Sequence, residues 1–226
     1  MHPPRTTDAG ERLGRALRSP VASVRLQAAL AAGTHPDPDH VEALVERCAI
    51  EPDFYVRDML TWALTRHPAS STVPRLLAET RSTVPQARSQ ALHTLSKVGD
   101  PLGWTAITPA LLRDADEDVA RSAWRAAVVL APPDSRARLA GALATQLGRG
   151  GRDVQLSLSR ALAALGDAAL PVLSAATEHA DVGVRTHATA TERLLREPDL
   201  AFDAAIDEAR RAVALRDAPV PEEAPC

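Results

Sequence analysis

Residues 118–130 read DVARSAWRAAVVL, and residues 23–33 (SVRLQAALAAG) and 87–101 (ARSQALHTLSKVGDP) follow the same plan. In each stretch a polar or acidic turn leads into a valine or alanine and usually an arginine. Alanine or leucine then follows three and six or seven residues later. Apolar residues at these intervals lie on one face of a helix. The stretches therefore predict amphipathic helices that recur along the chain.

The pattern occurs six times, and one residue in each copy serves as its anchor. A weaker motif, an apolar run with a proline, precedes three anchors by about fourteen residues, at 73–77, 108–112 and 170–173. Proline is tolerated in the first turn of a helix, whose N–H groups lack partners within the helix. Consecutive anchors are 30 to 35 residues apart, the length of two short helices and two turns. The anchors are Arg25, Arg57, Arg88, Ala120, Gln155 and Arg185.

Local signals mark where these helices begin and end. Carboxylates at 114–118 and 178–181 suit the N-termini of second helices, where they cap N–H groups and meet the positive end of the helix dipole. Gly33, Gly99 and Gly166 are expected as left-handed C-caps. Phe54 and Tyr55 are expected in a turn between two helices.

The three quoted stretches resemble bacterial HEAT repeats of the short, phycobilisome-lyase-like type, and the resemblance covers about residues 8–195. It implies an all-α fold, an α-α superhelix (solenoid) of about six helical hairpins. Such repeats serve lyases, hydroxylases, glycosylases and adaptors alike, so the resemblance does not select a function.

We expect residues 1–216 to form a single solenoid domain that ends in a capping helix. Asp199 is expected to cap this helix, whose polar outer face would close the last open core. Residues 217–226 contain three prolines and are expected to form a disordered tail. The apolar face of the capping helix is predicted to be Phe202, Ala205, Ile206, Ala209 and Val213.

The composition fits helices packed on helices and disfavours a nucleic-acid protein. Aromatic residues make up 3% of the chain, so the core must consist of alanine, leucine and valine. The net charge is −3, from 26 basic and 29 acidic residues, whereas proteins that bind phosphate backbones are usually basic. Lysine occurs once, at Lys97, which we interpret as the mark of a GC-rich bacterial genome.

No motif for catalysis, metal binding or a cofactor is recognised in the sequence. Cys48 and Cys226 form neither a disulfide framework nor a metal quartet, and the seven histidines are scattered. Nucleophile–base arrangements and glycine-rich phosphate loops are not recognised either. No segment has the apolar length of a signal peptide or membrane span, so we expect a cytoplasmic protein with no membrane partner.

Candidate binding residues lie on the second helices. In a solenoid these helices line the concave surface, and the position five residues after the anchor lies off the buried stripe. Neighbouring positions on the same face add further cations, aromatic side chains suited to contacts, and one acid. The predicted binding residues are Tyr55, Asp58, Trp62, Arg66, His93, Lys97, Arg121, Arg125 and Arg160.

The same residues can also be explained by purely structural roles. The surface could be a solvated helix face on which Arg121 and Arg125 neutralise the acids at 116–118. The anchor arginines could form a cationic ladder for a ligand. We favour the alternative that they form a structural ladder, each reaching an acidic turn or a helix C-terminus in the neighbouring repeat.

We predict a non-catalytic interaction scaffold that binds an acidic or anionic protein partner on its concave face. The alternative is a nucleic-acid-binding HEAT-like protein, similar in kind to alkylpurine DNA glycosylases, in which Asp58 would act among a tryptophan and an arginine. The resemblance to lyases suggests a third role, handling a tetrapyrrole chromophore. The sequence predicts no oligomeric state.

Overall fold

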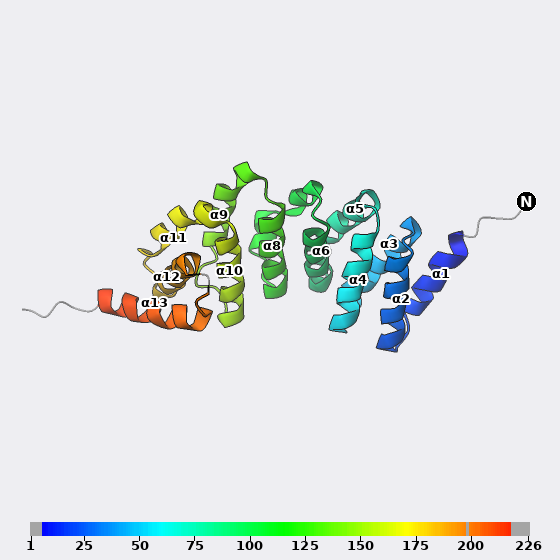
Figure 1. Ribbon diagram of the computed structural model, residues 1–226, viewed down its shortest axis with the longest axis horizontal. Coiled ribbons are helices and arrows are strands. Elements are labelled where there is room, and N and C mark those ends of the chain that lie inside the picture. Colours follow the sequence, from blue (N-terminus) through cyan, green and yellow to red (C-terminus); the bar gives the residue numbers. More distant parts are fainter. Residues whose placement is uncertain (1–5, 198, 218–226) are drawn as a thin grey trace, which may run out of the picture. The chain divides into compact units, whose positions relative to one another are not determined.

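The structure, a computed structural model, describes residues 6–197 and 199–217 of the 226-residue chain. Throughout this described part the regular elements are helices, and none is a β-strand. The chain divides into two compact units, Met1–Pro132 and Pro133–Cys226. The prediction of an all-α fold is confirmed (Figure 1).

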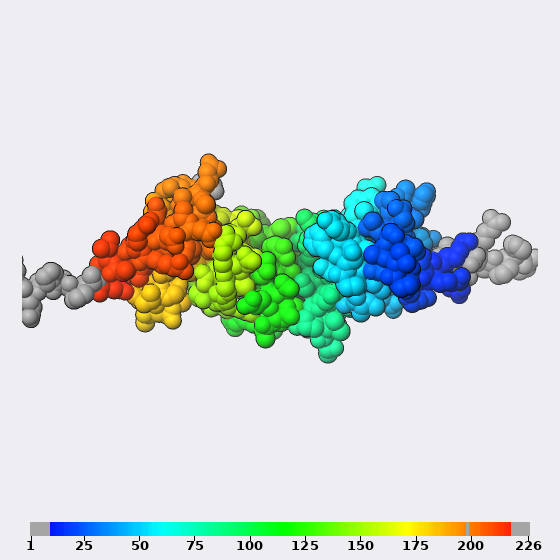
Figure 2. Space-filling view, turned by 90° about the horizontal axis from the view of Figure 1, so that it is seen from below, coloured from blue at the N-terminus to red at the C-terminus, as the bar shows by residue number. Residues whose placement is uncertain are grey.

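The first unit consists of four helical hairpins, each with a first helix and a longer second helix. The second helices stand side by side in chain order (Figure 1), and the colours of the space-filling view follow the same order along this unit (Figure 2). The first helices are α1 (Thr6–Leu17), α3 (Val41–Ile50), α5 (Ala69–Glu79) and α7 (Pro109–Leu112). The second helices are α2 (Ala22–Thr34), α4 (Phe54–Arg66), α6 (Pro85–Val98) and α8 (Glu117–Leu130). The 3-10 helices η1 (Pro38–His40) and η2 (Pro101–Ala106) precede α3 and α7.

The second unit adds two hairpins and a terminal helix. Its hairpins are α9 (Arg136–Ala144) with α10 (Arg152–Ala164), and α11 (Leu170–Ala176) with α12 (Val182–Arg196). The 3-10 helices η3 (Pro133–Ser135) and η4 (Gly166–Ala169) precede α9 and α11, and the terminal helix is α13 (Phe202–Arg216). The α13 helix packs on α12 and buries every residue of its predicted apolar face. Its N-cap is Ala201 and not Asp199, so that part of the prediction is wrong.

The anchor arginines hold the turn that precedes their own helix. In Arg25, Arg57, Arg88 and Arg185, Nη1 donates to the carbonyl oxygens six and five residues earlier, over 2.8–3.3 Å. Gln155 makes one such bond, to the Gly150 oxygen at 3.2 Å. Each turn thus has carbonyl groups satisfied by the helix that follows it.

Three of these arginines also reach a carboxylate in a later turn. Arg25 donates two bonds of 2.7 Å to Glu51, and Arg88 donates two bonds of 3.1 Å to Asp114. Arg185 pairs with Asp217, the C-cap of α13. Two parallel N–H···O bonds give the strong, directional geometry of an arginine–carboxylate pair. The structural ladder that the sequence favoured is confirmed for these arginines.

Aspartates cap three of the second helices, as predicted for two of them. Asp116 accepts from two backbone N–H groups of α8, Asp181 accepts from one of α12, and Asp53 accepts from two of α4. Because Asp53 caps α4, Phe54 and Tyr55 are the first residues of that helix, and their placement in a turn is wrong. Both aromatic side chains are exposed.

Two further expectations about helix ends are corrected. Gly99 and Gly166 adopt the left-handed conformation, with φ of 70° and 59°, but Gly33 lies inside α2. A Cβ atom on Gly33 would lie 2.3 Å from the Trp62 ring, so glycine is needed there for the close approach of α4. Pro74 lies inside α5 and not in its first turn, because that helix begins at Ala69.

The predicted tail at 217–226 lies outside the described residues except for Asp217. The single-domain organisation of residues 1–216 stays a prediction. In the described ranges no single helix is long and apolar enough to cross a membrane. The α10 helix and the segment Gly166–Ala176 meet the length and composition only as a pair, which is bent by 119° at its junction.

Candidate functional site

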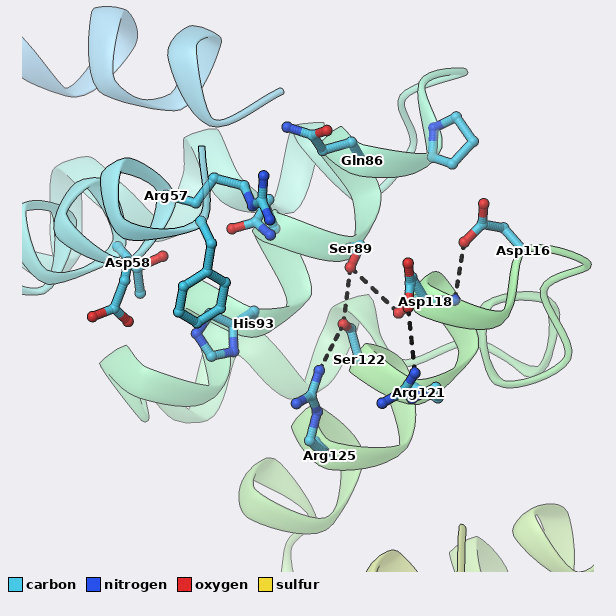
Figure 3. A pocket seen from close by; sticks show the side chains of 14 residues that line it. Arg57, Asp58, Gln86, Ser89, His93, Asp116, Asp118, Arg121, Ser122 and Arg125 are labelled. Atoms are coloured by element: carbon cyan, nitrogen blue, oxygen red, sulfur yellow. Dashed lines mark hydrogen bonds and ion pairs between the residues drawn. The ribbon is translucent and has the colours of Figure 1, made fainter. Parts of the chain in front are cut away.

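Side chains of α4, α6 and α8 form a groove of about 620 Å³ in the first unit (Figure 3). We call it the α4–α6–α8 groove. Phe54, Arg57, Asp58 and Thr61 line it from α4, and Pro85, Gln86, Ser89, Gln90 and His93 line it from α6. Asp116, Asp118, Arg121, Ser122 and Arg125 line it from α8 and its N-cap.

A chain of hydroxyl groups joins α6 to α8 within the groove. Ser89 donates to the Asp118 carbonyl oxygen at 3.3 Å, so the 2.9 Å bond between Ser122 and Ser89 has Ser122 as its donor. Arg125 Nη2 in turn donates to Ser122 Oγ over 3.1 Å (Figure 3). Both serines are buried. The chain therefore holds the Arg125 guanidinium in a defined position.

Arg57 lines the groove from the α4 side. Its Nη1 group bonds to the carbonyl oxygens of Glu51 and Pro52, at 2.9 and 2.8 Å. Its guanidinium carbon lies 6.0 Å from the centre of the Phe54 ring. Unlike the other three anchor arginines, Arg57 makes no ion pair with a carboxylate in the part of the chain that the structure describes.

Arg121 and Arg125 face the groove from α8, one helical turn apart. Arg121 lies 3.6 Å from Asp118, an exposed pair of the kind that contributes little to stability. Desolvation and then the charge of Arg121 lower the pKa of Arg125. Because an arginine remains protonated at any ordinary pH, α8 presents two neighbouring cations.

His93 lines the groove and is close enough to Arg125, Lys97 and Asp58 for their charges to act on it. Burial, followed by the charges of Arg125 and Lys97, lowers the pKa of His93, and Asp58 opposes this shift. The side chain is therefore largely uncharged at neutral pH. A negatively charged group that entered the groove would raise this pKa again.

The structure brings together some of the predicted binding residues and not others. Asp58, His93, Arg121 and Arg125 all line the groove, whereas the other five do not. Tyr55, Arg66 and Lys97 are exposed beyond its lining, although Lys97 is near enough to act on the pKa of His93. Trp62 is turned toward Gly33 of α2, and Arg160 is exposed on α10 of the second unit.

Several groove residues are not among the predicted binding residues. For Arg57 the structural ladder was favoured over a cationic ladder for a ligand, and Ser89 and Ser122 were not predicted at all. Asp58 was expected to be the only acid on this surface, but Asp116 and Asp118 line the groove too. The serines could have been noticed because they follow their anchors by one and two residues, where the second helices of adjacent repeats meet.

The site residues offer no metal centre or reactive thiol. In the described ranges no group of three or more histidine, cysteine, aspartate or glutamate side chains is placed to hold a metal ion. Cys48 is buried in α3, and burial raises its pKa to about 12. That thiol is protonated at neutral pH and packs as a small apolar group.

No protein-family model and no curated protein matches the chain. Among solved structures, it is similar to a triple mutant of Kap121p, a HEAT-repeat karyopherin, with a TM-score of 0.57 and 14% sequence identity. The match covers 93% of this chain and 26% of the Kap121p chain. At that identity the likeness shows the fold alone, and it supports a HEAT-like helical solenoid. The chain spans about a quarter of the length of the protein that it matches.

Proposed function

We propose that this chain is a non-catalytic protein-interaction scaffold whose α4–α6–α8 groove binds an acidic segment of a partner protein. The observation that carries the proposal is the arrangement of Arg57, Arg121 and Arg125, which face one groove from two of its helices. The lining also holds Asp58, Asp116 and Asp118, so the attraction is for single carboxylates placed at the arginines and not for negative charge in general.

The arginines are held before any partner arrives. The carbonyl oxygens of Glu51 and Pro52 position Arg57, and the Ser122–Ser89 chain positions Arg125. Binding then costs less side-chain entropy, because the guanidinium groups are already ordered. A guanidinium also matches a carboxylate with two parallel hydrogen bonds, which a lysine cannot do.

The acids of the groove favour a peptide over a nucleic acid. Asp58, Asp116 and Asp118 line the groove together with the arginines, so a continuous phosphate backbone would meet negative charges there as well as cations. A peptide can instead place single carboxylates at single arginines. Trp62, which the glycosylase alternative would need beside Asp58, lies against α2 and does not line the groove.

A labelled peptide of alternating glutamate and glycine residues tests the proposal by fluorescence anisotropy. The double variant Arg121→Gln/Arg125→Gln should bind it at least about tenfold more weakly, since every 1.4 kcal/mol of lost interaction is a factor of ten. The matched control is Arg66→Gln/Arg160→Gln, which removes the same charge outside the groove and should keep the affinity.

Two results would contradict the proposal. Equal weakening in both double variants would mean that the peptide responds to net charge and not to the groove. Tighter binding of a DNA duplex than of the peptide at moderate salt, with a steep salt dependence, would favour the nucleic-acid alternative.

The proposal extends to the compartment, the source, the repeat type and the domain organisation of the protein. We propose a cytoplasmic, bacterial protein with repeats of the phycobilisome-lyase-like type, on the resemblance of the stretches at 23–33, 87–101 and 118–130. We also propose that residues 1–216 act as one solenoid domain.

A further inference from the structure

The turn before each second helix has one position with a constant role. The residue six places before the anchor accepts a hydrogen bond from the backbone N–H two residues later, over 2.9–3.2 Å. This hydrogen bond is present in five of the six repeats, so the position has the same role in each of those turns. The residues are Ser19, Glu51, Ser82, Asp114 and His179.

Where this residue is an aspartate or glutamate, its carboxylate also accepts two hydrogen bonds from the anchor arginine of the preceding repeat. Glu51 accepts two bonds from Arg25, and Asp114 accepts two bonds from Arg88. Arg57 precedes Ser82 in the same way. The Ser82 hydroxyl carries no charge and accepts from the Val84 N–H at 3.2 Å, and it makes no bond with Arg57.

Arg57 is therefore bonded to its own turn as Arg25 and Arg88 are, but it lacks the carboxylate with which each of them pairs. Its Nη1 group is bonded to the preceding turn as theirs are, which fixes the direction of the guanidinium. The part of this guanidinium that in Arg25 and Arg88 meets a carboxylate, Nε and Nη2, has no such partner in the described ranges. The side chain lines the α4–α6–α8 groove (Figure 3). Its guanidinium carbon lies 6.0 Å from the centre of the Phe54 ring.

We infer that Arg57 is a carboxylate-binding residue that takes an aspartate or glutamate side chain of the acidic partner segment. The partner carboxylate would occupy the place that Glu51 takes on Arg25 and Asp114 takes on Arg88. The inference rests on the proposed function and adds where one carboxylate of the partner binds. The ligand is a carboxylate because three other anchor arginines, at the same repeat position, each pair with one in this structure.

The inference can be tested by supplying the absent carboxylate from within the chain. In Ser82→Asp, the new side chain would accept from the Val84 N–H and pair with Arg57, as Asp114 does with Asp116 and Arg88. Ser82 does not line the groove, so the substitution leaves the lining residues in place. We expect it to weaken binding of the glutamate–glycine peptide about tenfold, as Arg57→Gln does.

The matched control is Ser19→Asp. It makes the same chemical change at the equivalent position of the first repeat, where the described part of the chain holds no preceding anchor arginine. This variant should bind the peptide within about twofold of the unmodified chain. Ser82→Asp should raise the Tm of the chain, but it should neither raise the Tm nor weaken binding further when Arg57→Gln is already present.

Each other outcome has a definite meaning. Equal weakening by Ser82→Asp and Ser19→Asp would overturn the inference, because added negative charge alone would explain it. A rise in Tm that survives Arg57→Gln would overturn it too, because the new aspartate would then pair elsewhere. Loss of binding only in Arg121→Gln/Arg125→Gln would overturn the role of Arg57 and leave the scaffold standing. No peptide binding by the unmodified chain would overturn the scaffold and this inference with it.

Discussion

The junction between α2 and α4 and the junction between α4 and α6 use the same repeat positions with different results. At the first, Arg25 and the fully buried Glu51 form a two-bond ion pair, and Arg47 adds a bond of 2.7 Å to the same carboxylate. At the second, Ser82 replaces the carboxylate, and Arg57 lines a groove. The residue six places before the next anchor therefore decides whether an anchor arginine forms an ion pair between repeats or is left to line a groove.

The helices at the two junctions also pack differently. In the first, Gly33 lets the Trp62 ring lie directly on α2. In the second, α4 and α6 meet through the hydroxyl groups of Thr61 and Thr94, which are 3.4 Å apart. The first junction is closed by apolar contact and a buried ion pair, and the second keeps polar groups beside an open groove.

The same substitution at the two arginines gives the largest expected contrast. Arg25→Gln should lower the free energy of unfolding by about 3 kcal/mol, because it leaves the buried Glu51 with Arg47 as its one ionic partner. Arg57→Gln should cost less than about 1 kcal/mol, because it strands no charge and a glutamine can make one of the carbonyl bonds, as Gln155 does. Urea unfolding of the two variants measures the difference, and equal losses would contradict the comparison.

The loss of stability at acid pH gives a second test of the ion pair at the junction between α2 and α4. Burial alone would raise the pKa of Glu51, but the bonds from Arg25, Arg47 and the Asp53 N–H outweigh burial and lower it to about 2. Because the folded pKa is depressed, the stability from this group is present above the unfolded pKa of about 4.3 and is lost as pH falls toward 2. Arg25→Gln should reduce this acid sensitivity, and an unchanged pH profile would argue against the ion pair.

Gly33→Ala should produce the next largest effect. The new methyl group would lie 2.3 Å from the Trp62 ring and 2.9 Å from the Ala63 Cα atom, and such overpacking costs about 1–3 kcal/mol. Gly141→Ala is the matched control inside α9, where a Cβ meets nothing within 4 Å and the better helix propensity should raise stability slightly. Thermal unfolding compares the two, and a stable Gly33→Ala protein would mean that α2 and α4 separate easily.

The smallest expected effect concerns His93 of α6, which lines the groove beside the junction between α4 and α6. Arg125, Lys97 and burial keep this side chain largely uncharged near neutral pH, and a bound carboxylate would favour its protonation. Affinity for the glutamate–glycine peptide should therefore rise on the order of threefold as pH falls from about 7.5 to about 5.5, where glutamate is still ionised. In His93→Gln the peptide affinity should be independent of pH over that range, and an unaltered pH dependence would assign it to another group.

Features set by residues close together in the chain were predicted well. The hairpins, the aspartate caps and the apolar face of α13 depend on spacing within a single helix or turn. Asp199 and Pro74 were misplaced because helices began two or more residues from where the apolar pattern suggested. The shift at α13 is of the size expected where helix ends fray, whereas α5 begins five residues before the proline that was expected to mark its first turn.

Features set by contacts between repeats were predicted only in part: the arginine ladder was expected, but the close approach of α2 and α4 was not. In the sequence Gly33 resembles a glycine that ends a helix. In the structure glycine is needed there because the ring of Trp62, a residue of the next repeat, lies against it. Trp62 itself was expected on the binding face because its own helix leaves it off the buried stripe. The side chain is exposed, as that position predicts, but its ring also contacts α2 at Gly33, and no pattern within α4 records that contact.

The sequence by itself determined the fold, because a helix with alanine and leucine on one face must bury that face, and its regular repetition leaves stacking of hairpins as the solution. It also determined that arginine and carboxylate recur at set positions. Only the tertiary structure decided which arginine meets which carboxylate, since each partner comes from the next repeat. In that stacking Arg57, whose following turn has Ser82 in place of a carboxylate, lines one groove together with Arg121 and Arg125.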